Sequence, residues 1–181
     1  MLEILGWMVN LFVPPIITKL SDFLYYGNNS ITGKWIQICY DDSYEIERRY
    51  AIKEIKRKGN DFTIKGKGYF TEKTQAGGFF IPQEEFSSDF CRYDEQKLEY
   101  VSQSGNMTDI TKAYVTLDFD KFSRNSPVTY TGYYITHRQN KIRRVRGMKV
   151  TKALRRTHKI TSNEDALSAL VPLIQNSYSE N

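Results

Sequence analysis

The stretch YEIERRYAIKEI, which runs from Tyr44 to Ile55, decides the fold class because its polarity alternates along the chain. Tyr44, Ile46, Tyr50 and Ile52 share one face with Arg48, and Glu45, Glu47, Arg49 and Lys53 take the other. Successive side chains of a β-strand point to opposite faces, so the alternation predicts a half-buried strand. We expect its apolar face to be the buried one.

Strand-like stretches recur on both sides of this segment. The expected strands cover residues 32–40, 44–55, 61–71, 86–93, 98–103, 110–120, 128–137 and 142–154. Short polar connections rich in Gly, Asn, Asp and Ser separate them, as in β-hairpins. The sequence therefore predicts a mainly β protein, an antiparallel meander of about eight strands that closes into a lipocalin-like barrel. Such a barrel is wide enough to hold one small ligand.

Two segments flank this predicted barrel. Residues 1–26 are the most apolar part of the chain, with Glu3, Lys19 and Asp22 as their only charges. The apolar run is short for a transmembrane helix, and Pro14-Pro15 interrupts helical hydrogen bonding. We expect a retained helical segment that associates with a membrane, closes one end of the barrel or packs against a second copy.

The C-terminal segment has the pattern of a short amphipathic helix. Ser162 and Asn163 are N-cap candidates, and apolar residues follow at helical spacing. Pro172 argues for a kink or an end after about two turns. The expected organisation is an apolar segment at 1–30, a ligand-binding barrel at 31–160 and a short helix with a tail at 161–181.

The charge of the chain is unevenly distributed. No Asp or Glu occurs between Asp120 and Glu164, an interval that holds twelve Lys and Arg. A local basic field indicates an anionic partner, such as a nucleotide, a nucleic acid or a phospholipid headgroup, or else a solvated positive surface.

Enzyme and metal signatures are absent from the sequence. There is no nucleophile elbow, phosphate-binding glycine loop or HExxH motif, so we expect neither an enzyme nor a bound cofactor. Only two histidines occur, and Cys39 and Cys91 lack metal-ligand spacing. Both cysteines are expected as reduced thiols, with a disulfide between neighbouring strands as the alternative.

Basic and aromatic residues on strand faces are the candidate ligand-binding groups. A cation on an otherwise apolar strand face is unfavourable unless it meets an anion, which favours Arg48, Arg92 and Arg144. Tyrosine can stack on a nucleobase, and lysine can pair with phosphate. The aromatic and basic candidates completing the set are Tyr50, Tyr114, Tyr130, Tyr134 and Lys149.

Two motifs support a resemblance to a known family. TGKW at 32–35 is similar to the Gly-x-Trp motif that opens lipocalin-like barrels, and TYTGYYITHRQNKIRRVRGMKV at 129–150 joins an aromatic strand to a basic one. Together with the apolar N-terminal segment, they resemble the membrane-anchored β-barrel effectors of bacterial anti-phage (CBASS) defence. The usual two transmembrane helices of that family would need more residues than 1–26 provide.

This resemblance implies a function and a location. The barrel would bind a cyclic di- or oligonucleotide made by a functionally linked nucleotidyltransferase. Binding would lead the N-terminal segments to oligomerise in, or disrupt, the bacterial inner membrane, with the barrel in the cytoplasm and no DNA as partner. The alternatives are a lipocalin-like carrier of an apolar small molecule and a binder of phospholipid or nucleic-acid surfaces.

Overall fold

The computed structural model describes residues 31–40, 46–58, 61–74, 77–94, 96–105, 111–120, 129–137 and 142–176. The chain divides into two compact units, Met1–Ile31 and Thr32–Asn181. The predicted apolar segment, residues 1–26, lies outside the described residues. Among the described helices, none has the length and apolar character that a membrane crossing requires.

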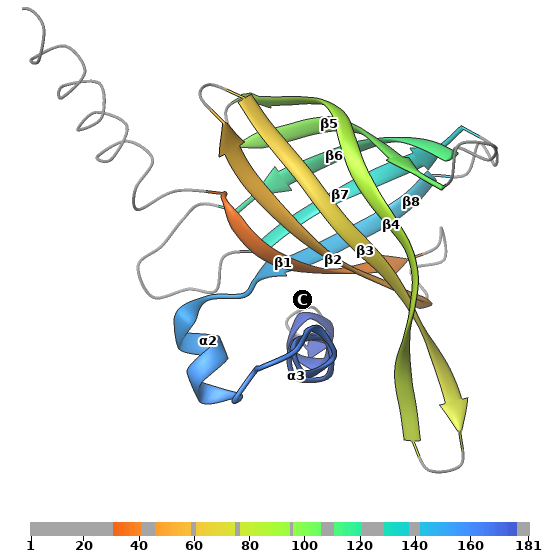
Figure 1. The fold of residues 1–181 in the computed structure, drawn as a ribbon, viewed down its shortest axis with the longest axis vertical. Helices are drawn as coiled ribbons and strands as arrows, with labels where there is room; N and C mark the ends of the chain where they lie inside the picture. The colour runs from red at the N-terminus through yellow and green to blue at the C-terminus, as the bar shows by residue number, and fades with distance from the viewer. Residues whose placement is uncertain are drawn as a thin grey trace, which may run out of the picture. The chain divides into compact units, whose positions relative to one another are not determined.

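The second unit contains a closed antiparallel barrel of eight strands (Figure 1). The strands are β1 Gly33–Tyr40, β2 Ile46–Lys58, β3 Asp61–Thr74, β4 Gly77–Asp94, β5 Lys97–Ser104, β6 Thr111–Phe119, β7 Thr129–Thr136 and β8 Ile142–Lys149. Each strand pairs with the next, and β8 pairs with β1 to close the sheet. The predicted meander barrel is confirmed.

The observed β4 is much longer than the predicted strand 86–93. It begins at Gly77, opposite Thr74, and forms a long hairpin with β3. Pro82 has no backbone donor for the ladder, but the register shifts between Lys67 and Tyr69, beside the position paired with Pro82. A bulge at that place accommodates the proline within the ladder.

Residues 152–154, which we predicted as the end of the last strand, belong to a helix instead. Helix α2 spans Lys152–Thr157, and the hydroxyl of Thr151 accepts a hydrogen bond from the backbone N of Leu154 at 3.2 Å. This N-cap satisfies a donor that has no partner within the helix, and therefore ends the extended conformation.

Helix α3, Asn163–Asn176, continues through Pro172, so of the two predicted alternatives, a kink or an end, the end is wrong. Ser162 caps it, as predicted, by accepting a hydrogen bond from the backbone N of Asp165 at 3.0 Å. Pro172 is on the exposed side, and the buried stripe continues beyond it to Ile174. This stripe packs against the sheet on both sides of Pro172, which stabilises the helix although Pro172 has no backbone N–H to donate.

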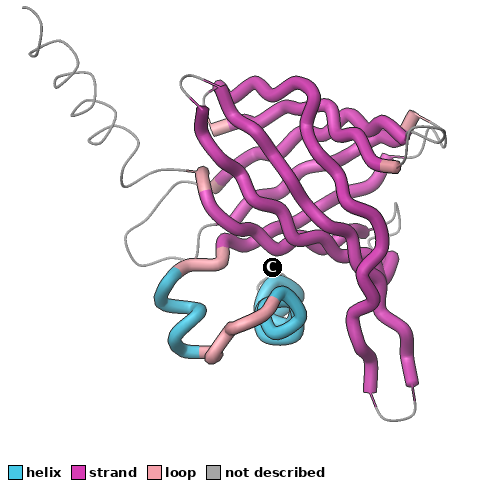
Figure 2. Tube along the Cα trace, in the orientation of Figure 1, coloured by secondary structure: helices cyan, strands magenta, loops and turns pink. Residues whose placement is uncertain are grey.

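Apolar side chains form one cluster outside the barrel and another inside it. The two helices lie on one side of the sheet (Figure 2), and α3 packs over β1, β2 and β8. The outer cluster joins the sheet to α3 through Ile36, Ile38, Tyr50, Ile52, Tyr69, Met148, Leu167, Leu170, Val171 and Ile174. Inside, the rings of Trp35, Phe119 and Tyr130 lie 5.1–5.4 Å apart and fill one end of the barrel. The other end is free of this aromatic packing.

The apolar face of β2 is buried, as predicted, but it is covered by α3 on the outside of the barrel. Its apolar residues Tyr50 and Ile52 belong to the outer cluster under α3. Lys53, on the other face, hydrogen-bonds Gln37 and Tyr100 within the barrel. The alternation was predicted correctly, but the hydrophobic face is covered by a helix, and the polar face is turned inward.

Candidate functional site

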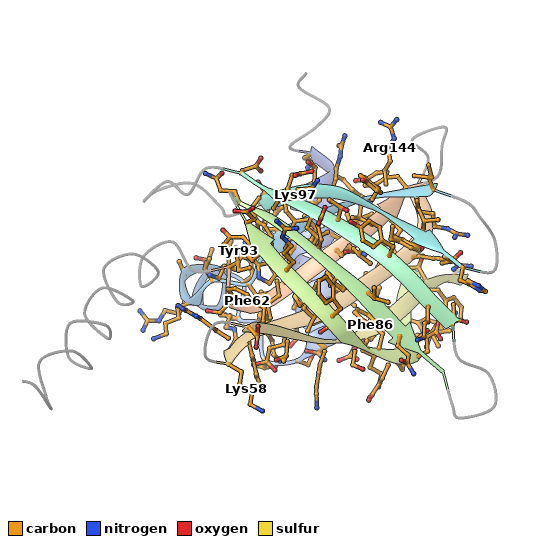
Figure 3. The ribbon with its side chains drawn as sticks, turned by 90° about the horizontal axis from the view of Figure 1, so that it is seen from above. Lys58, Phe62, Phe86, Tyr93, Lys97 and Arg144 are labelled. Atoms are coloured by element: carbon orange, nitrogen blue, oxygen red, sulfur yellow. The ribbon has the colours of Figure 1, made fainter. Side chains whose placement is uncertain are left out.

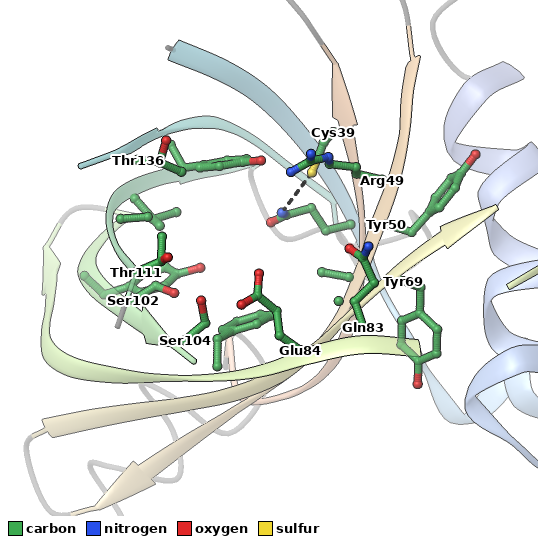
Figure 4. A pocket seen from close by; sticks show the side chains of 18 residues that line it. Cys39, Arg49, Tyr50, Tyr69, Gln83, Glu84, Ser102, Ser104, Thr111 and Thr136 are labelled. Atoms are coloured by element: carbon green, nitrogen blue, oxygen red, sulfur yellow. Dashed lines mark hydrogen bonds between the residues drawn. The ribbon is translucent and has the colours of Figure 1, made fainter. Parts of the chain in front are cut away.

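A cavity of about 150 Å³ lies inside the barrel, beside the aromatic cluster (Figure 4). Seven of the eight strands contribute to its wall, from Gln37 and Cys39 on β1 to Tyr134 and Thr136 on β7. Gly68 on β3 also lines the cavity, and an added Cβ there would make an ordinary van der Waals contact with the backbone oxygen of Glu84 at 3.6 Å.

The second inward-facing glycine of β3 does not widen the cavity. A Cβ on Gly66 would lie 2.2 Å from the Phe86 ring, so that ring already occupies the space. Both residues are paired across β3 and β4, and Phe86 lines the cavity. Of these two glycines, Gly68 alone has space beside it for a Cβ.

A buried polar network lies at the inner boundary of the cavity. The Lys53 ammonium donates hydrogen bonds to Gln37 Oε1 at 2.5 Å and to the Tyr100 hydroxyl at 3.1 Å. The Tyr130 hydroxyl donates to the same Gln37 oxygen at 3.0 Å. Because Gln37 and Tyr100 line the cavity, they separate Lys53 from it by a single layer of side chains.

Lys53 is the most unusual charged residue of this network. Only 1% of its surface is exposed, and its interactions are with neutral partners, including the faces of the Tyr100 and Tyr130 rings at 5.5 and 5.0 Å. Among the described residues, no carboxylate pairs with it. Burial lowers the pKa of Lys53 to about 7, and the Cys39 thiol opposes this shift weakly. A buried ammonium of this kind favours an anion in the adjoining cavity.

Two arginines add positive charge to the interior. Arg49, on β2, lines the cavity and reaches over it near Cys39 (Figure 4). Arg143, on β8, is 5% exposed, and its guanidinium lies 5.7 Å from the centre of the Tyr134 ring. Arg143 is paired with Tyr134 across β7 and β8, which places it on the inner face.

Hydroxyl groups form much of the remaining wall. On β5, Ser104 is paired with Thr111 of β6 and Ser102 with Ala113, and Thr136 adds a fourth hydroxyl from β7. The Thr136 oxygen is buried and has no hydrogen-bond partner within the described part of the chain. Glu84 contributes the wall's carboxylate. These groups can hydrogen-bond a polar ligand at several points.

Three of the predicted ligand-binding residues are on the inner face. Tyr134 lines the cavity, and Tyr130 belongs to the buried network. Lys149 is half-buried at the aromatic end, with its ammonium 5.8 Å from the centre of the Trp35 ring, and burial lowers its pKa. The structure therefore places Tyr130 and Tyr134 at the cavity and Lys149 away from it.

The other predicted residues have different surroundings. Arg144 is exposed on the outer face and points away from the barrel (Figure 3). Arg92 is exposed too, with an ion pair to Asp94 at 3.6 Å, and Tyr114 is 41% exposed. Our assignment of Arg92 and Arg144 to the inner face was wrong, because Arg143, not Arg144, has the inward register on β8.

Two predicted residues of β2 complete this comparison. The Tyr50 ring packs edge-on against Phe80 at 5.1 Å and points away from the cavity, towards α3 (Figure 4). The side chain of Arg48 lies outside the described residues. Tyr50 and Arg48 are two residues apart and therefore share one face of β2. Both ligand-binding residues that we predicted on this strand thus belong to the face that α3 covers.

Sequence reasoning missed the residues that form the cavity floor. Gln37 and Arg49 line the cavity, Lys53 and Arg143 are buried on the inner face beside it, and none of the four was a candidate. One available signal was Lys53 itself, which occurs between Ile52 and Ile55 in the clearest strand of the chain. Without knowing that α3 covers the apolar face, that lysine was assigned to solvent.

The described residues contain no cluster of three or more His, Cys, Asp or Glu side chains that could hold a metal ion. Cys39 and Cys91 are free thiols rather than a disulfide. Burial raises the pKa of Cys91 to about 11, so its thiol is a poor nucleophile near neutral pH.

Comparisons with protein-family models, with curated proteins and with solved structures found no match for this chain. The class that the fold and the cavity define is a closed eight-stranded antiparallel barrel with a cationic, hydroxyl-lined interior.

Proposed function

We propose that the barrel is a receptor for a small phosphorylated ligand, and that this ligand is a cyclic nucleotide signal. In this proposal the chain is an antiviral effector of the CBASS type. The apolar N-terminal segment oligomerises in, or disrupts, the bacterial inner membrane when the barrel in the cytoplasm binds a nucleotide made by a linked nucleotidyltransferase.

The observation that carries the proposal is the position of Lys53. A buried ammonium without a carboxylate partner in the described structure is destabilising, and a bound anion one layer away would offset part of that cost. Arg49 and Arg143 add to the same positive potential. A phosphate oriented towards Gln37 and Tyr100 would have these cations around it.

The rest of the wall supports a nucleotide rather than a simple inorganic anion. The Tyr134 ring offers a stacking surface, already contacted by Arg143 on one side. The Ser102, Ser104 and Thr136 hydroxyls suit a ribose or the edge of a base. The cavity is smaller than the roughly 300–1,000 Å³ typical of ligand pockets. A larger cyclic nucleotide would place one phosphate at the floor and extend towards the open end.

An apolar cargo receives less support from these features. A carrier of fatty acids or isoprenoids would bury a hydrocarbon chain against apolar side chains, whereas this wall presents hydroxyls, a glutamate and an arginine. Mass spectrometry of ligands extracted from the purified protein is the direct test of that alternative.

Isothermal titration of the full chain with a panel of cyclic di- and oligonucleotides tests the proposal. We expect binding to at least one member, and we expect Lys53→Met to weaken it about tenfold, because a unit charge one side-chain layer away contributes on the order of 1.5 kcal/mol at an effective dielectric constant of about 20. The matched control is Lys65→Met, because Lys65 is exposed on the outside of β3. No binding to any member, or equal effects of both substitutions, would contradict the proposal.

A further inference from the structure

Helix α2 and the turn after it carry a dense positive surface outside the barrel. Lys152, Arg155, Arg156, His158 and Lys159 are all exposed, within eight consecutive residues. We refer to residues 152–159 as the α2 basic surface. It lies outside the cavity wall and is not explained by the proposed ligand site.

This surface is a fixed structure rather than a solvated tail. Leu154 and Ile160 pack against the outer hydrophobic cluster and attach both ends of the segment to the barrel. The backbone N of His158 donates to the carbonyl of Leu154 at 3.0 Å, and Ile160 N donates to Arg155 O at 3.0 Å. The backbone therefore holds the cations in one place and limits the entropy lost when they meet a partner.

The lysines and arginines of this surface have no Glu or Asp partner within the described residues, in contrast to several cations on the barrel wall. On the barrel wall, Lys56, Lys67, Arg92 and Lys97 each form an ion pair with a glutamate or aspartate. Within the described residues, Lys152, Arg155, Arg156 and Lys159 have no such pair. The next acids are Glu164 and Asp165, and the Asp165 carboxylate accepts hydrogen bonds from the backbone of Thr161 and Ser162.

The surface also has a defined place relative to the start of the barrel. The backbone N of Val150, just before α2, donates to the carbonyl of Lys34 at 2.8 Å. Lys34 follows the first residue of β1, so α2 leaves the barrel at the end where β1 begins (Figure 1). The apolar segment 1–26 precedes β1 in the chain by only a few residues.

We propose that the α2 basic surface binds the anionic headgroups of a lipid bilayer. Clusters of four to eight Lys and Arg beside a membrane segment or on the surface of a helix are typical of binding to anionic lipids, and the α2 basic surface holds four. A single-stranded nucleic acid would be expected to need aromatic stacking surfaces, whereas residues 152–159 contain no Phe, Tyr or Trp. The proposal extends the proposed function, since it rests on the membrane role assigned there to residues 1–26.

Vesicle flotation of the full chain separates this contribution from that of the apolar segment. Binding to neutral phosphatidylcholine vesicles reports the apolar segment, and the additional binding to vesicles containing phosphatidylglycerol reports electrostatic attraction. Each cation near an anionic surface contributes about fivefold. Arg155→Gln/Arg156→Gln should therefore reduce the additional binding on the order of 25-fold and leave the neutral-vesicle binding unchanged.

The control has the same change in charge at another site. Lys65→Gln/Lys112→Gln removes two exposed cations from β3 and β6, and it should leave the phosphatidylglycerol preference largely intact. Equal losses in the two double variants, no loss in either, or no preference of the unsubstituted chain for phosphatidylglycerol would overturn the proposal. So would a stronger effect of the arginine substitutions on binding of a single-stranded oligonucleotide than on vesicles.

Titration of the same variants with nucleotides distinguishes this proposal from the previous one. Arg155 and Arg156 do not line the cavity, so their substitution should leave nucleotide affinity unchanged. Vesicle binding that depends on the arginines, with no nucleotide bound by any form, would support the lipid surface and reject the receptor function. Nucleotide binding with no arginine-dependent vesicle binding would reject the lipid surface alone.

Discussion

The substitution Lys53→Met should change how the stability of the barrel depends on pH. The folded-state pKa of Lys53 is about 7, against an ordinary value of 10.5. Between about pH 7 and pH 10.5, Lys53 is protonated in the unfolded chain and neutral in the folded chain. The free energy of unfolding therefore rises with pH in this range, because raising the pH favours the state that binds fewer protons. Below about pH 7 both states are protonated, and the full cost of the buried ammonium remains.

The size of this effect follows from the pKa difference. A shift from 10.5 to about 7 corresponds to a cost on the order of 5 kcal/mol for the charged form. Between about pH 7 and pH 8.5, the unsubstituted protein should gain roughly 1.5 kcal/mol from this group. Methionine has a similar length and no charge, so the variant should lack this gain and should be the more stable form at pH 7.

Urea unfolding at several pH values in this range measures the difference. A Trp7→Phe background leaves Trp35, which is buried in the barrel, as the single fluorescent tryptophan. Contributions from Lys149, whose pKa is also lowered, are common to both proteins and cancel in the difference. A constant difference between Lys53→Met and the parent across the range would refute the conclusion that Lys53 is buried with a lowered pKa.

Three further outcomes are expected. Gly66→Ala should destabilise the barrel by about 1–3 kcal/mol in urea unfolding, because the new Cβ would overlap the Phe86 ring. Gly68→Ala should have a much smaller effect, because its Cβ would make only an ordinary van der Waals contact; equal losses would contradict the packing described for β3. Ser162→Ala should lower stability by about 1 kcal/mol through the lost cap of α3, and Ser168→Ala, on the exposed side of the same helix, should not; similar losses from both substitutions would rule out the cap. An anionic ligand beside Lys53 should bind more weakly as pH rises from about 7 to 9, because it favours the protonated lysine. Calorimetry in buffers of different ionisation enthalpy should then show proton uptake on binding, whereas pH-independent affinity would place the ligand elsewhere.

Much of the barrel could be predicted because strand formation leaves a local pattern. Alternating polarity and turn residues predicted eight strands in the observed order, and the N-cap of α3 was predicted from Ser162. The long extension of β4 was missed, because Pro82 is compatible with a strand only beside a bulge that pairing with β3 creates.

The candidate site was harder to predict than the fold. Tyr130 and Tyr134 were recognised, since their strand is rich in aromatic residues. Arg144 was preferred to Arg143, although a displacement of one residue reverses the face on which a side chain lies. Arg143 and Arg144 are adjacent residues of the same type, so the sequence around them does not show which of the two points into the barrel.

The sequence by itself determined the number and order of the strands, the alternation of β2 and the concentration of positive charge after Asp120. Only the tertiary structure decided which face of the sheet is the interior. Helix α3 covers Tyr50 and Ile52 from outside, so the polar face of the same strand closes around the cavity and buries Lys53. Alternation depends on neighbouring residues, whereas burial depends on what packs against each face from more than a hundred residues away.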